Sequence, residues 1–422
     1  TLEGTTWIQI NRSGVHSSGD NYATFTGRSV LARTNQKQCS IEIFAGNEEY
    51  GQALICDSEN KAYLFKIEGS GALSGRTYYS AEITVDGTVA PSVGVIHDKH
   101  YVVAGASTHK NTVYYSHTLE PDNFSGAGAG SISIDDQVVG LKSFRTDLFI
   151  FCKNSIYKLV NINDTQNISI VPIAKNVGCL SHFSIQEIGG DLVFLSPDGI
   201  RSVAATARIG DVELGSVSRQ ISSVTSVIAR DINDFIITSC VLRRRSQYRL
   251  YYSTAAGNVA DAKGIIGTMT NQGFEWSETK GIQASSLVSD FSNVGIEKLQ
   301  HGDKDGYIYN HDVGGAFSAD GSLFNIDAKY TTPFLDFGDV GTRKTMKYVK
   351  ISVTPEGELA PILRTQYDFT DKDVAQPEDI VLVGIPVPPI FGTATFGNAI
   401  FEGTNDPMAR QVLEGSGHTV SF

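Results

Sequence analysis

The 422-residue chain is poor in charge, in proline and in the sulfur-containing amino acids. Charged residues make up 19% of it, against an average of about 25% for soluble domains. It has only 12 prolines, five cysteines and three methionines. Asp and Glu outnumber Lys and Arg, 46 to 34, which gives a net charge of −12. A protein that binds nucleic acid without regard to sequence carries the opposite sign, because it must neutralise phosphates. The negative net charge therefore argues against a sequence-independent nucleic-acid-binding protein.

Long hydrophobic runs are also missing. The longest apolar run, Ile380 to Gly392, contains three prolines, and a membrane-spanning helix needs about 20 apolar residues. The five cysteines are odd in number and widely spaced, without the CxxC or Cys–His spacing of a metal site. We therefore expect reduced, structural thiols, folding in a reducing cytoplasm, and neither a metal nor a cofactor.

Glycine and aromatic residues are plentiful instead. The chain has 42 glycines, 17 tyrosines and 21 phenylalanines. Short runs of β-branched and aromatic residues alternate with Gly, Asp, Asn and Ser, which is typical of strands joined by tight turns. Helical spacing of apolar residues is nearly absent. The sequence predicts an all-β protein.

Pairs of strand-like runs, each joined by a short polar turn, recur six times. They lie at residues 53–66, 100–116, 147–159, 191–203, 236–253 and 296–310. Their spacing is close to the roughly 40–50 residues of one four-stranded blade. A single blade cannot bury both of its faces, whereas a ring of blades covers each face with a neighbour. The repeat favours a β-propeller of about six blades, within a range of five to seven, over a β-sandwich with accidental spacing.

The repeat ends near residue 328, and this sets the expected domains. Residues 1–38 are predicted to be an N-terminal β segment that packs on or closes the propeller. The propeller is predicted over residues 39–328, and a β-sandwich-like module over residues 329–422.

Motifs that could carry catalysis are weak. The sequences SPDG at Ser196–Gly199 and SADG at Ser318–Gly321 are similar to the Asp-box turn of sialidases, but neither continues with the spaced Gly and Trp of that motif. Asp303–Gly306 offers two carboxylates, too few for a calcium loop. Tight turns explain these segments, because Asp and Gly tolerate positive φ. We expect no enzyme and no catalytic residues.

The triplet Arg243, Arg244 and Arg245 stands out in an acidic chain. It lies between two strand-like runs, so we expect a hairpin loop. A solvated loop is one interpretation. Contact with an acidic partner subunit is another, because guanidinium groups pair well with carboxylates. Nucleic-acid binding is a third. The triplet is the candidate subunit-contact site of this sequence.

Several segments share the pattern of one family of virion proteins. They are VYYSHTLEPDNFSG (113–126), ISIDDQVVGLKSFRTDLFIFCKNSIYKLV (132–160), VGCLSHFSIQEIGGDLVFLSPDGIRSV (177–203), the strand from Gly341 to Ile351 and the FGxxxFGxxxF segment from Phe391 to Phe401. In these segments the chain resembles the tail nozzle, or tail hub, proteins of short-tailed bacteriophages. The family's pattern supplies no catalytic residues.

The resemblance implies a structural virion protein. In that family several copies, typically a homohexamer, form a ring below the portal and adaptor, and loops narrow the channel until DNA leaves. It implies contacts with phage adaptor and tail fibre proteins, and with passing genomic DNA without sequence-specific binding. The resemblance also allows contact with the host outer surface. The implied location is the virion tail, after assembly in the host cytoplasm. The negative charge of each chain suits a channel past which DNA slides without sticking.

Two other functions stay open. A phage receptor-binding or glycan-processing propeller would need a cleft with clustered aromatic residues and carboxylates. A cellular propeller could instead bind peptides at a blade edge, although the chain lacks the WD and kelch signatures of such proteins.

Overall fold

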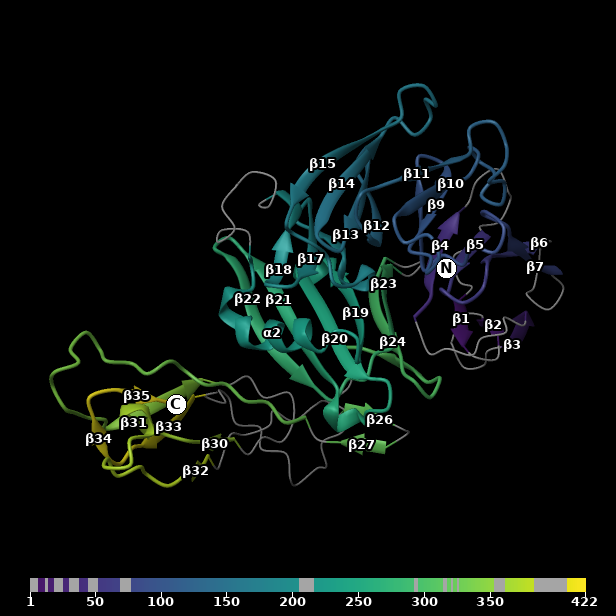
Figure 1. Cartoon of the computed structure of the whole chain (residues 1–422). Coiled ribbons are helices and arrows are strands. Elements are labelled where there is room, and N and C mark those ends of the chain that lie inside the picture. Colours follow the sequence, from purple (N-terminus) through teal and green to yellow (C-terminus); the bar gives the residue numbers. More distant parts are fainter. Residues whose placement is uncertain are drawn as a thin grey trace. The chain divides into compact units, whose positions relative to one another are not determined.

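The computed structural model of the chain is shown in Figure 1. It describes residues 7–11, 14–18, 26–29, 38–44, 52–68, 77–204, 216–291, 295–313, 317–319, 322–324, 326–352, 361–382 and 408–422. The chain divides into two compact units, Thr1–Asp312 and Val313–Phe422. The division falls before residue 328, where the repeat was predicted to end.

The first unit contains a six-bladed β-propeller, and the predicted all-β propeller is confirmed. Blades 1 and 2 consist of β4 (Ser40–Phe44), β5 (Gln52–Cys56), β6 (Ala62–Glu68) and β7 (Thr77–Ile83), and of β8 (Val93–His97), β9 (His100–Ala104), β10 (Thr112–Tyr115) and β11 (Gly130–Ser133). Blades 3 and 4 consist of β12 (Val138–Phe144), β13 (Asp147–Cys152), β14 (Ser155–Val160) and β15 (Ser169–Lys175), and of β16 (Gln186–Ile188), β17 (Asp191–Ser196) and β18 (Gly199–Ser202). Blades 5 and 6 consist of β19 (Phe235–Leu242), β20 (Gln247–Thr254), β21 (Lys263–Thr270) and β22 (Gly273–Lys280), and of β23 (Ser286–Phe291), β24 (Glu297–Gly302) and β25 (Ile308–Asn310).

The first strand of each blade lies nearest the axis. Neighbouring strands pair antiparallel in sequence order within every blade, and β4 contacts β8, β8 contacts β12, β16 contacts β19, and β19 contacts β23. The ring closes where Gln38 Nε2, just before β4, donates a hydrogen bond of 2.9 Å to the carbonyl oxygen of Ser285, just before β23. First and last blades are therefore neighbours, although 247 residues separate the two partners.

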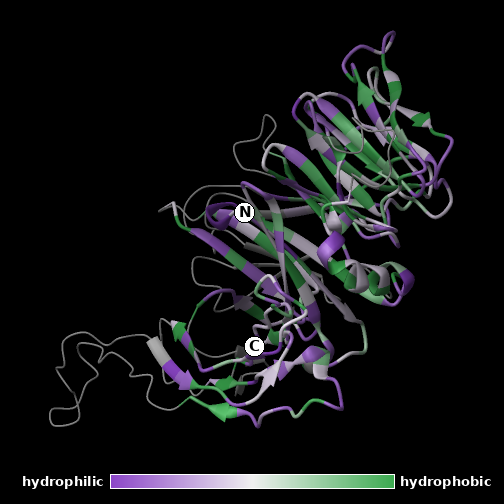
Figure 2. Ribbon diagram, turned by 90° about the vertical axis from the view of Figure 1, so that its left-hand side faces the viewer, coloured by the Kyte–Doolittle hydropathy of each residue, from purple (hydrophilic) through white to green (hydrophobic). Residues whose placement is uncertain are grey.

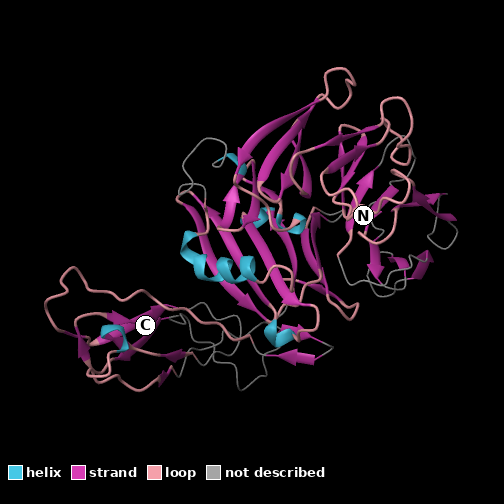
Figure 3. Ribbon diagram, in the orientation of Figure 1, coloured by secondary structure: helices cyan, strands magenta, loops and turns pink. Residues whose placement is uncertain are grey.

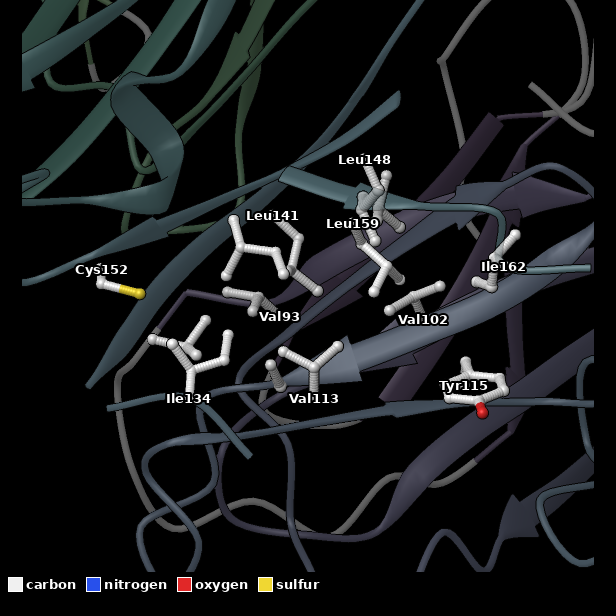
Figure 4. Packing of buried hydrophobic residues seen from close by; sticks show 14 residues of the cluster. Val93, Val102, Val113, Tyr115, Ile134, Leu141, Leu148, Cys152, Leu159 and Ile162 are labelled. Carbon is white, nitrogen blue, oxygen red and sulfur yellow. The ribbon is translucent and has the colours of Figure 1, made fainter. Parts of the chain in front are cut away.

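Apolar clusters fill the spaces between consecutive blades. Figure 4 shows the cluster between blades 2 and 3, where Val93 and Val102 meet Leu141 and Leu148. Central strands such as β5 and β9 are buried along their whole length and therefore on both faces. Figure 2 shows apolar segments, in green, along strands of the chain. The outermost strand β15 is instead largely exposed. Burial between two neighbours explains why the repeat is visible as runs such as LFIFC.

Five of the six repeated hairpins are the second and third strands of their blades. The fifth, residues 236–253, contains β19 and β20, which are the first and second strands of blade 5. Its predicted equivalence with the other copies is therefore wrong by one strand. Any apolar strand followed by a polar turn gives the same local pattern, whereas contacts with neighbouring blades decide a strand's place.

Two further elements accompany the propeller. A three-stranded sheet, β1 (Trp7–Asn11), β2 (Gly14–Ser18) and β3 (Thr26–Ser29), precedes it, and β3 contacts β7. Helix α2 (Ser222–Arg230) lies in the connection between blades 4 and 5 (Figure 3). It packs on β18, and its Ile228 is fully buried. Among the described residues, no helix has the length and apolar character that spanning a membrane requires.

The second unit is a small antiparallel β unit. Its paired strands are β26 (Phe317–Ala319) with β27 (Ser322–Phe324), β28 (Lys344–Thr345) with β34 (Ser416–Gly417), β29 (Tyr348–Ser352) with β33 (Met408–Val412), β30 (Ile362–Leu363) with β32 (Ile380–Val381), and β31 (Gln366–Tyr367) with β35 (Val420–Ser421). Leu363, Leu382 and Leu413 form its core. The segment Phe391–Phe401 lies outside the described residues.

The packing between blades should dominate the stability of the propeller. Leu148 on β13 is fully buried, and Leu148→Ala should lower the free energy of unfolding by about 2–5 kcal/mol through lost burial and a cavity. Val171→Ala on β15 is the control, because Val171 is exposed and the change should stay within about 0.5 kcal/mol. Urea unfolding followed by fluorescence would measure both. Equal effects would contradict the assignment of β13 to the core.

Candidate functional site

Charged and titratable side chains act on one another near the propeller axis. Glu42 lies on β4, Lys142 on β12, and His182 begins the short 3-10 helix η2 (His182–Ser184), which contacts β12 and β19. The positive charge of Lys142 acts on both Glu42 and His182. Residues from blades 1 and 3 and from the entry to blade 4 therefore form one group, which we call the axial cluster.

Burial sets the protonation of the axial cluster. Loss of water raises the pKa of Glu42 from 4.5 to about 7, and the charge of Lys142 opposes that rise. Burial lowers the pKa of His182 to about 3, and Lys142 lowers it further. His182 is therefore neutral at pH 7, while Glu42 can gain or lose a proton there. Neutral Glu42 stabilises the fold fully below about pH 4.5, and this contribution is lost as the pH rises through 7.

His182 is fitted closely against the backbone of β12. A Cβ atom added to Gly140 would lie 3.1 Å from His182 Cα and 3.2 Å from His182 Nδ1. Nδ1 is buried and has no hydrogen-bond partner among the described residues. Glycine at position 140 thus permits the imidazole to approach β12.

Four of the cysteines are buried thiols. Cys56 Sγ lies 2.9 Å from the hydroxyl oxygen of Tyr101, and burial raises the pKa of Cys56 to about 12. Cys152, Cys179 and Cys240 are also buried thiols, with pKa values raised to about 12 by burial. The run LFIFC predicts burial for Cys152, and the structure places Cys152 in the core with Cys56, Cys179 and Cys240. Such thiols are poor nucleophiles at neutral pH.

The predicted arginine triplet forms the turn between β19 and β20. Residues Arg243–Arg245 make up the 3-10 helix η5 and are exposed. The backbone N–H groups of Arg243 and Arg244 donate hydrogen bonds of 2.9 Å to the two carboxylate oxygens of Glu297 on blade 6. The predicted hairpin turn is therefore present, and a neighbouring blade holds its backbone.

Among the described residues, the guanidinium groups of Arg243 and Arg245 have partners. Arg243 lies over the ring of Phe291, 5.8 Å from its centroid. Arg245 Nη1 donates to Asp312 Oδ2 at 3.1 Å. The role of the triplet in binding another subunit stays a prediction, and Arg244 is its most available member because its described contact is through the backbone.

Sequence reasoning did not find Arg249, which is the most buried charge of this region. Arg249 on β20 is only 4% exposed at its side chain and makes two hydrogen bonds with Asp312, of 3.2 and 2.8 Å. A charged residue inside the apolar strand QYRLYY was the available signal, because an arginine there requires a partner. Nothing in the sequence around Arg249 indicates that its partner is Asp312, 63 residues further along the chain.

Two of the predicted turns lie within the described residues. In the first, Asp198 pairs with Arg201, and Gly199 has a φ of +127°. In the second, Asp303 Oδ1 accepts hydrogen bonds of 2.9 Å from the N–H groups of Asp305 and Tyr307. The SADG segment at Ser318–Gly321 lies partly outside the described residues. No group of three or more metal-ligating side chains occurs within the described ranges.

Comparison with known proteins does not assign the chain to a family. No family model and no curated protein matches the chain. Solved structures that are similar include the N-terminal domain of Nup159, with 14% identity, a TM-score of 0.41 and coverage of 68% of this chain and 78% of that one. BBS1N in complex with ARL6DN has 8% identity, a TM-score of 0.42 and coverage of 73% and 87%. A protein of Bacteroides uniformis to which 6-phosphogluconolactonase activity is provisionally attributed has 10% identity, a TM-score of 0.41 and coverage of 74% and 94%. Such low similarity carries no argument about function.

The axial cluster can be tested by removing its positive charge. Lys142→Met should raise the pKa of Glu42 above about 7, because Lys142 favours the ionised carboxylate. Carboxyl carbon NMR of Glu42 across pH 4 to 9 would measure it. Lys158→Met is the matched control on the same blade, because Lys158 pairs with Asp147 instead. An unchanged Glu42 titration in Lys142→Met would contradict the cluster.

Arg249 and Arg245 offer a matched pair of substitutions on one carboxylate. Arg249→Met should destabilise the chain by about 1.5–3 kcal/mol, because a buried charge-assisted hydrogen bond is lost. Arg245→Ala removes a 57% exposed side chain from the same carboxylate and should cost less than about 1 kcal/mol. Denaturant unfolding would compare the two variants. A larger loss of unfolding free energy for Arg245→Ala would contradict the assignment of Arg249 as the main partner of Asp312.

Proposed function

We propose that the chain is a non-enzymatic structural subunit of the tail nozzle, or tail hub, of a short phage tail. The observation that carries an assembly role is that two strand pairs of the second unit present apolar side chains on both faces. The specific setting rests on the resemblance of residues 113–126, 132–160 and 177–203 to nozzle proteins.

The first such pair is β29 with β33. Tyr348 lies directly opposite Val412, and these side chains are 48% and 64% exposed. Arg410 covers part of the tyrosine, with its guanidinium 4.2 Å from the ring centroid. On the other face, Val349 and Ile351 pack against the core of the unit. One face of this pair is thus used internally, and the other is open.

The second pair is β30 with β32, and it repeats the arrangement. Ile362 lies opposite Val381, and they are 64% and 54% exposed. Their neighbours Leu363 and Ile380 face the core. A sheet with one buried face normally carries polar residues on the solvent face. Cross-strand apolar pairs there favour a surface that another protein covers.

The propeller would serve as the rigid part of such a subunit. Buried charges between blades 5 and 6 are paired internally, as Arg249 with Asp312 and the turn at Arg243 with Glu297 show. In the proposed setting, copies of the chain form a ring in the virion tail with adaptor and fibre proteins. Its acidic character keeps passing DNA from sticking.

Polar substitution of the open face tests the assembly role. The double variant Ile362→Ser, Val381→Ser should weaken self-association or partner binding by about tenfold or more, because desolvated apolar anchors carry most interface energy. Sedimentation velocity over a concentration series would measure self-association. Val227→Ser is the control, since Val227 is an exposed apolar residue of α2 in the first unit. Association that survives the double variant unchanged would count against this face.

The tail setting has its own measurement. Quantitative peptide mass spectrometry of purified particles, against the major capsid protein, should give roughly six copies of the chain, as a nozzle ring requires. Higher multiples of three would favour a fibre or spike and revive the glycan-processing alternative. Absence from particles would overturn the proposal.

A further inference from the structure

The propeller ends in two histidines whose rings are hydrogen-bonded to each other. His301 lies on β24 and is buried, and His311 follows β25. His301 Nδ1 and His311 Nε2 are 2.7 Å apart, and the ring centroids are 4.7 Å apart. His301 also stacks on Tyr309, with centroids 5.0 Å apart. Each ring is therefore held in a fixed orientation.

This pair fastens the last residues of the first unit. The N–H group of His311 donates to the carbonyl oxygen of Leu299 at 2.9 Å, and the next residue, Asp312, is bound by Arg249. Val313 then begins the second unit. Residues 308–312 thus join the two units along the chain, and their attachment depends on β20 and β24.

The groups facing the pair come from several elements. From β20, the hydroxyl of Tyr251 lies 3.5 Å from His311 Nδ1, and Arg249 acts on His311 with its positive charge. Asp312 acts on His311 with the opposite sign. Cys240 on β19 lies in the same surroundings, because the charges of Arg249 and Asp312 act on it. Glu297 on β24 accepts a hydrogen bond from the backbone N–H of Arg243, in the turn that leads into β20.

We propose that the His301–His311 pair is an acid-sensitive latch, which holds residues 308–312 while its imidazoles are neutral and releases them on protonation. A hydrogen bond between two imidazoles needs one unprotonated nitrogen as acceptor. When both rings are charged, both nitrogens are donors and the rings repel each other. The positive charge of Arg249 adds to that repulsion.

The direction of the pH effect follows from burial. Burial lowers the pKa of His301 to about 3, and His311 lowers it further. Burial lowers the pKa of His311 to about 4, with Arg249 as the next cause. On release of residues 308–312, His311 leaves its buried site and His301 loses the rings that cover it, so both pKa values should rise toward about 6.5. The released state therefore binds more protons below pH 6.5, and release becomes more favourable as the pH falls from there toward 4.

The neighbouring ion pair does not titrate in the same window. Burial alone would raise the pKa of Asp312, but hydrogen bonding to Arg249 and the charges of Arg249 and Arg245 hold that pKa below its usual range. The Asp312 carboxylate accordingly stays ionised while the histidines take up protons. Loss of attachment between pH 6.5 and 4 would report on the histidine pair.

Hydrogen exchange of the full chain tests the latch. After correction for intrinsic exchange, opening of residues 308–312 should increase by up to about tenfold per pH unit for each histidine as the pH falls from 6.5 to 4.5. Strand β13 should stay protected over that range. In His301→Gln, His311→Gln the opening should lose its pH dependence, whereas the exposed control His109→Gln should behave as the wild type.

A second measurement needs no variant. Proton NMR of the imidazole Cε1–H groups in the wild-type chain should show both His301 and His311 titrating below pH 5. Titration of both near pH 6.5, or equal protection of residues 308–312 at pH 7 and pH 4.5, would overturn the proposal. Failure of the double variant to fold leaves this measurement to decide.

Discussion

Each propeller blade must bury two faces, and this requirement organises the first unit. A blade such as β12–β15 is covered on one side by blade 2 and on the other by blade 4, through separate apolar clusters. Because no blade can do this alone, the ring must close on itself. The hydrogen bond from Gln38 to Ser285 marks the meeting of the first and last blades.

Polar groups between blades are stable only when a neighbouring blade supplies the partner. Arg249 of blade 5 and Asp312 at the end of blade 6 form such a pair, and Glu297 of blade 6 holds the Arg243–Arg245 turn of blade 5. In the axial cluster, the charge of Lys142 opposes the effect of burial on the pKa of Glu42 without cancelling it, and it adds to the effect of burial on the pKa of His182. Both pKa values therefore lie far from their usual range. Blade packing thus determines the electrostatics as well as the fold.

Two strand pairs of the second unit bury one face each and leave the other exposed. Its strands pair two by two around Leu363, Leu382 and Leu413, which leaves apolar cross-strand pairs open on the outer faces. In the propeller a neighbouring blade covers the corresponding faces. The contrast suggests that the second unit obtains its missing layer from another protein, which is the basis of the assembly role proposed for the chain.

The sequence by itself determined the all-β class, the hairpin repeat, the burial of Cys152 and the turns at Asp198 and Asp303. These depend on residue preference and period, which act between near neighbours in the chain. Only the tertiary structure decided the count of six blades and the true place of residues 236–253. It alone also placed Lys142 where its charge acts on Glu42, and paired Arg249 with Asp312. These partners meet across blades, and nothing in the local pattern of either strand specifies which distant side chain will lie opposite.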